Sequence, residues 1–271
     1  GDSVPNKNVA PVKSRTCAEQ KLNDPTSSSG VYSLIDPMDD NAEWETWCDM
    51  SSSGGGWTLL GRSVKGAAGG QGAWGLAGWN DYTVKGFGEP NGDGNYWAPL
   101  QLWQKLLSTH PKNIVYWSDS NNAVGGGSTT KITNLKLEGN KYKLMCGSVA
   151  NSENFANSCN QNYFTTHDQD NDVWGSNCAK DNVGNLGGNW YTNCYQNSMY
   201  HSQTNSPGSF KTNYHTGGGT AVSYIKIYFR EENPQKSDSS GTLSSPATSI
   251  SEENEVVSSL SLNYKPGSGL E

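Results

Sequence analysis

The stretch EWETWCDMSSSGGGWTLLGRSV, residues 43–64, decides the fold. Residues 43–50 and 56–64 concentrate β-forming side chains on either side of a turn that is rich in Ser and Gly. Gly suits such a turn because it has no Cβ and so reaches backbone conformations that other residues avoid. The stretch therefore predicts two strands, with Trp44, Trp47 and Trp57 available for a core.

Further strands are predicted on both sides of this stretch. Residues 31–36 and 222–230 have the same β-rich character. Residues 131–146 are typical of a hairpin that turns at Glu138-Gly139-Asn140 and carries Ile132, Leu135 and Leu137 on its first arm. The chain should therefore contain several strands, spread from residue 31 to residue 230.

One helix is expected between residues 97 and 110, because apolar side chains recur there at helical spacing. Asp93 or Asn95 is available as its cap, and Pro111 as its stop. The 32 Gly and 11 Pro disfavour long helices elsewhere. The predicted fold class is therefore α+β. The helical positions are Trp97, Leu100, Trp103, Gln104 and Leu107.

Charge and hydropathy exclude two kinds of partner. The chain has 19 Lys and Arg against 26 Asp and Glu, a net charge of −7, which argues against nucleic acid. No apolar run approaches the roughly 18 residues that a membrane helix requires. We expect neither a nucleic-acid partner nor a membrane span.

The cysteines point to disulfides in an oxidising, extracellular compartment. Their number is even, no CxxC pair occurs, and the chain has only four His, which argues against zinc. Fifteen pairings are formally open, and local closure of three neighbouring pairs is the most economical. The residues are Cys17, Cys48, Cys146, Cys159, Cys178 and Cys194.

The two ends differ from the middle of the chain. Residues 1–16 are expected to form an extended N-terminal segment, and residues 17–231 the folded domain. Residues 232–271 are rich in Ser and are predicted to be a tail or linker, because they offer little apolar surface to bury. Val256 to Leu262 alternate enough to form a strand that docks on a partner's sheet edge.

Several motifs follow one another in a distinctive order between residues 17 and 231. They are SGVY (29–32), WCDM (47–50), GGGWT (54–58), WNDY (79–82), KGFG (85–88), YWAPL (96–100), FTTHDQDNDVWGSNCA (164–179) and GGNWYTNC (187–194). In order and spacing they resemble the fibrinogen C-terminal-like domain, which includes the lectin-like ficolins and tachylectins. The resemblance implies a mostly antiparallel central sheet, few short helices, and a loop-rich subdomain that binds calcium and ligand.

The resemblance implies a calcium site in the segment 168–176. The carried-over ligands are the carboxylates of Asp170 and Asp172 and the main-chain carbonyls of Trp174 and Ser176, and Ca²⁺ is the expected cofactor. The segment is not an EF-hand. An EF loop opening at Asp168 would need Gly and Glu where Val173 and Ala179 stand.

The resemblance also implies a ligand pocket in the ring that Cys178 and Cys194 would close. A cis peptide before Cys194 would turn backbone N–H groups toward an acetyl oxygen, with aromatic rings around the methyl group. Tyr195 departs from the family, which usually has His at that position. The implied contacts are Asn193, Cys194, Tyr195, Trp190, Tyr191 and Tyr200, and an alternative interpretation of the aromatics is that they only fill the core.

The sequence thus favours a secreted, non-enzymatic, calcium-dependent recognition module that binds carbohydrate or another acetylated ligand. No GxSxG, HExxH or P-loop motif occurs, and the histidines are scattered. The alternative is a structural extracellular protein that self-associates into fibres or an adhesive layer through its domain and tail. The two hypotheses differ in whether binding a glycan or assembly is the primary role.

Overall fold

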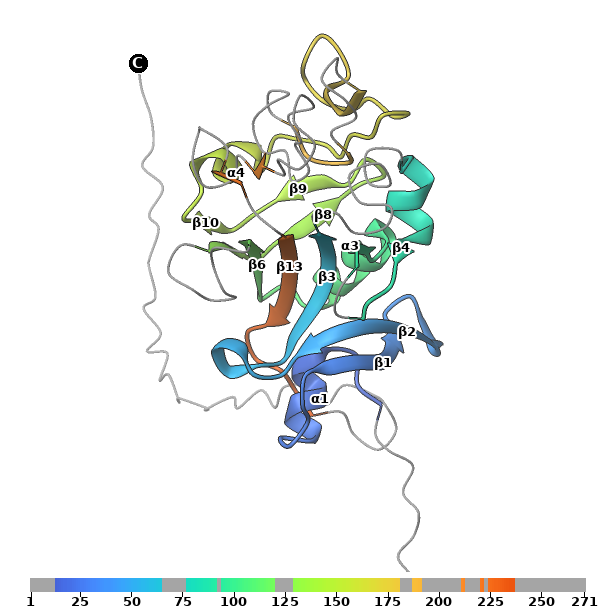
Figure 1. The fold of residues 1–271 in the computed structure, drawn as a ribbon, viewed down its shortest axis with the longest axis vertical. Helices are drawn as coiled ribbons and strands as arrows, with labels where there is room; N and C mark the ends of the chain where they lie inside the picture. Colours follow the sequence, from blue (N-terminus) through green and yellow to red (C-terminus); the bar gives the residue numbers. More distant parts are fainter. Residues whose placement is uncertain are drawn as a thin grey trace, which may run out of the picture.

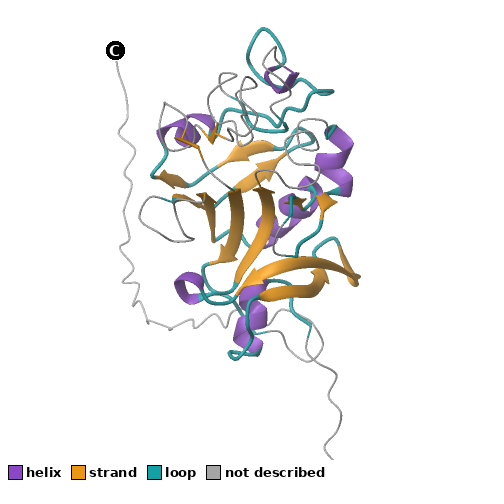
Figure 2. Cartoon of the chain, in the orientation of Figure 1, coloured by secondary structure: helices purple, strands orange, loops and turns teal. Residues whose placement is uncertain are grey.

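The computed structural model describes residues 13–64, 77–91, 94–119, 129–180, 187–191, 211–212, 220–221 and 224–236, the two dipeptides by their backbone alone. Its helices are short, as Figure 2 shows in purple. The α-helices are α1 (Cys17–Asn23), α3 (Leu100–Thr109) and α4 (Glu153–Ser158). Two short segments, η1 (Ser52–Gly54) and η3 (Cys178–Lys180), are 3-10 helices. A third, η2 (Asp81–Lys85), is a short π-helix.

The centre of the molecule is a nine-stranded sheet (Figure 1). Its main path runs β1-β2-β3-β13-β6-β7-β10, with β5 beside β3 and β4 beside β5, and each pair is antiparallel. The strands of this sheet are β1 (Gly30–Asp36), β2 (Asp39–Asp49), β3 (Trp57–Val64), β4 (Phe87–Gly88), β5 (Tyr96–Trp97), β6 (Asn113–Asp119), β7 (Thr130–Thr133), β10 (Ser148–Ala150) and β13 (Tyr224–Glu231).

Two small hairpins lie outside this sheet. One pairs β8 (Lys136–Glu138) with β9 (Lys143–Met145), and the other pairs β11 (Lys211–Thr212) with β12 (Thr220–Ala221). Helix α3 packs beside β8, and the side-chain amide of Gln104 donates to the carbonyls of Leu137 and Gly139, both at 3.0 Å. The α+β fold class expected from the sequence, with an antiparallel central sheet and short helices, is therefore confirmed.

The core is built from aromatic side chains. The indole of Trp97 stacks on Trp103 with ring centroids 4.5 Å apart, and Tyr82 meets the edge of Trp97 at 5.3 Å. Aromatic pairs at such distances add to the free energy gained by burying their area. Five Trp side chains are among the largest that are completely buried: Trp57, Trp97, Trp103, Trp117 and Trp190.

The expected helix is confirmed but begins later than predicted. Trp97 lies in β5, Pro99 is the N-cap residue, and His110 is the C-cap. Asn95 serves another purpose, because its Oδ1 accepts the backbone N–H of Val64 at 2.9 Å and joins β3 to the β5 segment.

The hairpin predicted over 131–146 was wrong on its first arm. Ile132 belongs to β7 in the large sheet, whereas Leu137 belongs to β8 in the separate hairpin. The chain changes direction at Asn134, whose φ of +49° no regular strand allows. The apolar residues on both sides of Asn134 are buried, so the alternation of apolar and polar residues continues across the break and does not reveal it.

None of the described helices is both long and apolar enough to cross a membrane. Residues 237–271 and 1–12, which include most of the predicted tail and of the N-terminal segment, lie outside the described residues.

Candidate functional site

The segment that leads into the expected calcium loop is packed in the aromatic core. Phe164 is completely buried and its ring meets Trp190 edge-on at 4.7 Å. The next residue, Thr165, exchanges two backbone hydrogen bonds with Asn189, at 2.9 and 3.0 Å. The start of the loop is therefore fixed to the segment that precedes the predicted ligand ring. In Figure 1 this loop, coloured yellow, lies at the end of the molecule opposite α1.

Asp168 ties the loop to a second part of the chain. Its Oδ1 accepts the backbone N–H of Trp79 at 2.8 Å and the hydroxyl of Thr166 at 2.7 Å. Burial alone would raise the pKa of Asp168, but the hydrogen bonds from Thr166 and Trp79 outweigh it and hold the pKa below its ordinary value. Asp168 acts as an anchor between segments 89 positions apart.

Asp170 and Asp172, the two predicted carboxylate ligands, lie together in the next turn. Oδ1 of Asp170 accepts the backbone N–H of Asp172 at 3.3 Å. The two oxygens of Asp172 accept the N–H groups of Trp174 and Cys178, each at 2.9 Å. Burial, together with the charge of Asp170, raises the pKa of Asp172 although these two N–H groups lower it.

Neither Asp170 nor Asp172 forms an ion pair with Lys, Arg or His anywhere in the part of the chain that the structure describes. Two carboxylates two positions apart, without a basic partner, offer hard oxygen atoms of the kind that Ca²⁺ takes. The donor set therefore fits the ion that the resemblance implies.

Trp174 and Ser176, the predicted carbonyl ligands, follow in the same loop and are exposed. The side chain of Trp174 is 53% exposed and that of Val173 is 69% exposed. Large apolar side chains in such a position are costly to hydrate, so this part of the loop presents an apolar surface beside the two carboxylates.

Of the six predicted pocket residues, the structure describes two. Trp190 and Tyr191 are buried, and the indole N–H of Trp190 donates to the carbonyl of Tyr142 at 2.6 Å. Both rings support this region from within, and ligand contact by them stays a prediction. The remaining four contacts lie outside the described residues: Asn193, Cys194, Tyr195 and Tyr200.

Two of the predicted disulfides are present, Cys17–Cys48 and Cys146–Cys159, with Cα atoms 5.4 and 5.6 Å apart. Cys178 is also disulfide-bonded, and its predicted partner lies outside the described residues. The first disulfide fastens α1 to β2, and the second closes a loop around α4.

Asn171 and Asn177 position the loop, a role that sequence reasoning missed. The amide of Asn171 donates to the carbonyl of Phe164 at 2.9 Å, and that of Asn177 donates to Thr166 at 3.0 Å. Oδ1 of Asn177 accepts the N–H of Ala179 at 2.9 Å. Asn side chains often bond nearby backbone in turns, so their spacing in NDVWGSN was the available signal.

Comparison with known proteins identifies this architecture. The profile of the family described as "Fibrinogen beta and gamma chains, C-terminal globular domain" matches residues 13–217. Mouse angiopoietin-related protein 2 is 30% identical over 176 residues, which cover 65% of this chain and 33% of that protein. Human tenascin-R is 28% identical over 184 residues, covering 68% of this chain and 13% of its own length.

Solved structures agree on the fold. The fibrinogen-like globe domain of human ANGPTL6 superposes with a TM-score of 0.64 at 23% identity, covering 86% of this chain and all of that one. The lamprey fibrin D-dimer, solved with the peptide Gly-His-Arg-Pro-amide, gives 0.59 at 14% identity and covers 94% of this chain and 84% of its own. The chain spans about a third of the angiopoietin-related relatives that it matches.

Proposed function

Because the chain belongs to the family of fibrinogen C-terminal globular domains, we propose that it is a non-enzymatic extracellular recognition domain whose binding site adjoins a calcium-ordered loop. Disulfides support the extracellular placement, since they persist in oxidising compartments. The observation that carries the proposal is the loop 168–178, which holds two carboxylates without a basic partner among the described residues.

In this proposal Asp170 and Asp172 hold Ca²⁺ through their carboxylates, and Trp174 and Ser176 through their carbonyls. The ion supplies the positive charge that lets two adjacent carboxylates face each other. Asp168 and Asn177 keep the loop closed by hydrogen bonds to its base whether or not the ion is bound.

The ligand is an acetylated glycan, or another acetylated group, bound by Asn193, Cys194, Tyr195 and Tyr200. This ligand class follows from the family resemblance. The exposed apolar side chains of Val173 and Trp174 on the neighbouring loop support it, because sugar and acetyl methyl groups pack on apolar surface. A single site of this kind is weak, so several copies of the domain would raise avidity a hundredfold or more.

The test is an array of acetylated and non-acetylated glycans, probed with the purified chain in calcium and in EDTA. We expect acetyl-dependent binding that EDTA abolishes and that Tyr195→Ala loses. The matched control is Tyr163→Ala, which removes another tyrosine, 37% exposed, that lies outside the proposed site. Equal binding in EDTA, or retained binding by Tyr195→Ala, would contradict the proposal. A silent array with large assemblies in solution would favour the self-associating structural protein instead.

A further inference from the structure

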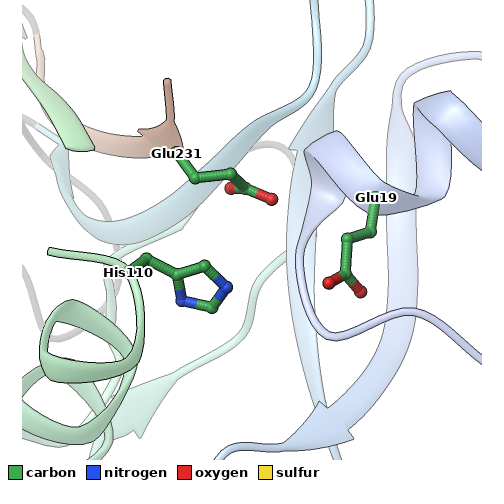
Figure 3. Close-up of side chains that lie close together, drawn as sticks. All are labelled: Glu19, His110 and Glu231. Atoms are coloured by element: carbon green, nitrogen blue, oxygen red, sulfur yellow. The ribbon is translucent and has the colours of Figure 1, made fainter. Parts of the chain in front are cut away.

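Three side chains from distant parts of the sequence meet at the end of the molecule opposite the calcium loop. Glu19 comes from α1, His110 from the C-cap of α3, and Glu231 from the last position of β13. Their ligand atoms all lie within 4.8 Å of one another. Figure 3 shows the three side chains directed into the space between these elements. The cluster is independent of the proposed function.

Both carboxylates of the cluster are removed from water. Glu19 is 1% exposed and Glu231 is 4% exposed. Oε1 of Glu231 accepts the hydroxyl of Thr16, but Oε2 is buried without a hydrogen-bond partner. A buried carboxylate oxygen without a partner costs free energy unless a cation or a donor reaches it. This oxygen is therefore the observation that calls for a ligand.

His110 presents the geometry of a ligating imidazole. Its Nδ1 lies 2.9 Å from the carbonyl of Leu106, one helical turn earlier, and 3.0 Å from the hydroxyl oxygen of Thr109. The Thr109 hydroxyl can donate to the carbonyl of Lys105 or Leu106 instead of to the ring. We assign the proton to Nδ1 because the Leu106 carbonyl can only accept, and this assignment leaves the lone pair on Nε2. In metalloproteins a ligating His commonly donates its other ring N–H to a backbone carbonyl, which fixes tautomer and ring orientation.

A purely structural role accounts for part of the cluster. Oε2 of Glu19 accepts the backbone N–H of Arg15 at 2.7 Å, and Thr16 caps α1 by accepting the N–H of Glu19 at 3.0 Å. These bonds explain Glu19 as a capping residue. They do not explain why a second buried carboxylate and an imidazole face it.

We propose that Glu19, His110 and Glu231 form a binding site for a divalent transition-metal cation, with zinc as the first choice. One imidazole and two carboxylates suit zinc, whereas calcium prefers oxygen atoms alone. Around zinc, neighbouring ligand atoms lie about 3.3–3.6 Å apart. The ligand atoms here lie within 4.8 Å of one another, so side-chain rotations that move them by about 1 Å would bring them to coordination distance.

A surface hollow of about 380 Å³ lies between α1 and the end of β13. Glu231 is among the residues that line it, whereas Glu19 and His110 are not. A bound cation would join the first helix of the domain to the end of its last central strand.

The test is a zinc titration of the metal-stripped full chain by calorimetry, with the Tm followed in parallel. We expect about one zinc per chain and a rise in Tm of roughly 5–10 °C once free zinc reaches a hundred times Kd. His110→Asn and Glu231→Gln should each weaken binding at least tenfold. The matched controls, His167→Asn and Glu232→Gln, should leave zinc binding unchanged. Glu232 is the exposed neighbour of Glu231, and His167 directly precedes Asp168 of the calcium loop.

Zinc-edge X-ray absorption on the unmodified protein keeps the test open if a variant fails to fold. We expect nitrogen and oxygen neighbours at about 2.0–2.1 Å, with the signature of one imidazole. The proposal is overturned by the absence of zinc binding, by a shell without imidazole, or by binding that survives both site variants. Zinc binding that is lost in Asp170→Ala would place the ion at the calcium loop and equally overturn it.

Discussion

The anchor between the calcium loop and the 77–82 segment can be tested from both sides. A Cβ added to Gly78 would lie 2.6 Å from Oδ2 of Asp168, closer than real atoms approach, and 3.4 Å from Oδ1, an ordinary contact distance. Gly78→Ala should therefore push the carboxylate away from its two donors, Trp79 and Thr166. Asp168→Ala removes the same carboxylate and creates the space that the new methyl group needs.

The expected magnitudes follow from two hydrogen bonds at a partly exposed position. At about 1 kcal/mol for each bond, Asp168→Ala should lower the free energy of unfolding by about 2 kcal/mol. Gly78→Ala should forfeit one or both bonds, about 1–2 kcal/mol. In the Asp168→Ala background the same change should be neutral or should stabilise by about 0.4–1 kcal/mol, because Ala restricts the unfolded chain.

The assay is a double-mutant cycle measured by denaturant and by thermal unfolding in EDTA, so that no ion contributes. The coupling between the two positions should be about 1–2 kcal/mol, and each kcal/mol corresponds to about 2–4 °C in Tm for a domain of this size. Additive losses, with the double variant the least stable of the three, would refute the contact.

Three other perturbations have clear expectations. Replacing both Cys146 and Cys159 by Ser should cost about 3 kcal/mol by the chain-entropy estimate for a loop of this length, and calorimetry should show Tm about 6–12 °C lower, whereas an unchanged Tm would contradict it. Asn113 is completely buried, and its amide both donates to and accepts from the backbone of Leu135, so Asn113→Ala should lower the free energy of urea unfolding by about 2–4 kcal/mol; a loss below about 1 kcal/mol would argue against this network. Hydrogen bonds from the N–H of residue 78 and from Lys85 hold the pKa of Asp81 below its ordinary value, so Asp81 stabilises the fold above about pH 4 and loses this contribution as pH falls through its folded pKa. The difference in free energy of unfolding between the unmodified chain and Asp81→Asn should therefore disappear in acid, and a difference that does not change with pH would contradict this expectation.

Local sequence patterns predicted the strands and the long helix well, because alternation and apolar spacing act within a few residues. The predicted strands at 31–36, 43–50 and 56–64 correspond to β1, β2 and β3 with small shifts at their ends. The ends of α3 were less predictable. Its start depends on Trp97 pairing in β5 with Gly61, a contact that no local pattern contains.

Long-range pairing marks the limit of prediction from sequence. The strand predicted at 222–230 corresponds to β13 (Tyr224–Glu231), but its position between β3 and β6 joins segments more than a hundred residues apart in the chain. The same limit hid the cluster of Glu19, His110 and Glu231, whose members show no common spacing. At the calcium loop, the motif predicted which residues gather, whereas the anchoring by Asp168 to Trp79 required the fold.

The most direct test of the account is a calcium titration of the full chain by calorimetry, with Tm measured in calcium and in EDTA. The account predicts one calcium per chain in this loop and a calcium-dependent rise in Tm that Asp170→Ala abolishes. The matched control is Glu45→Ala, which removes an exposed carboxylate from β2, and it should keep the full rise. An undiminished rise in Asp170→Ala, or the absence of any calcium effect on the unmodified chain, would contradict the central claim.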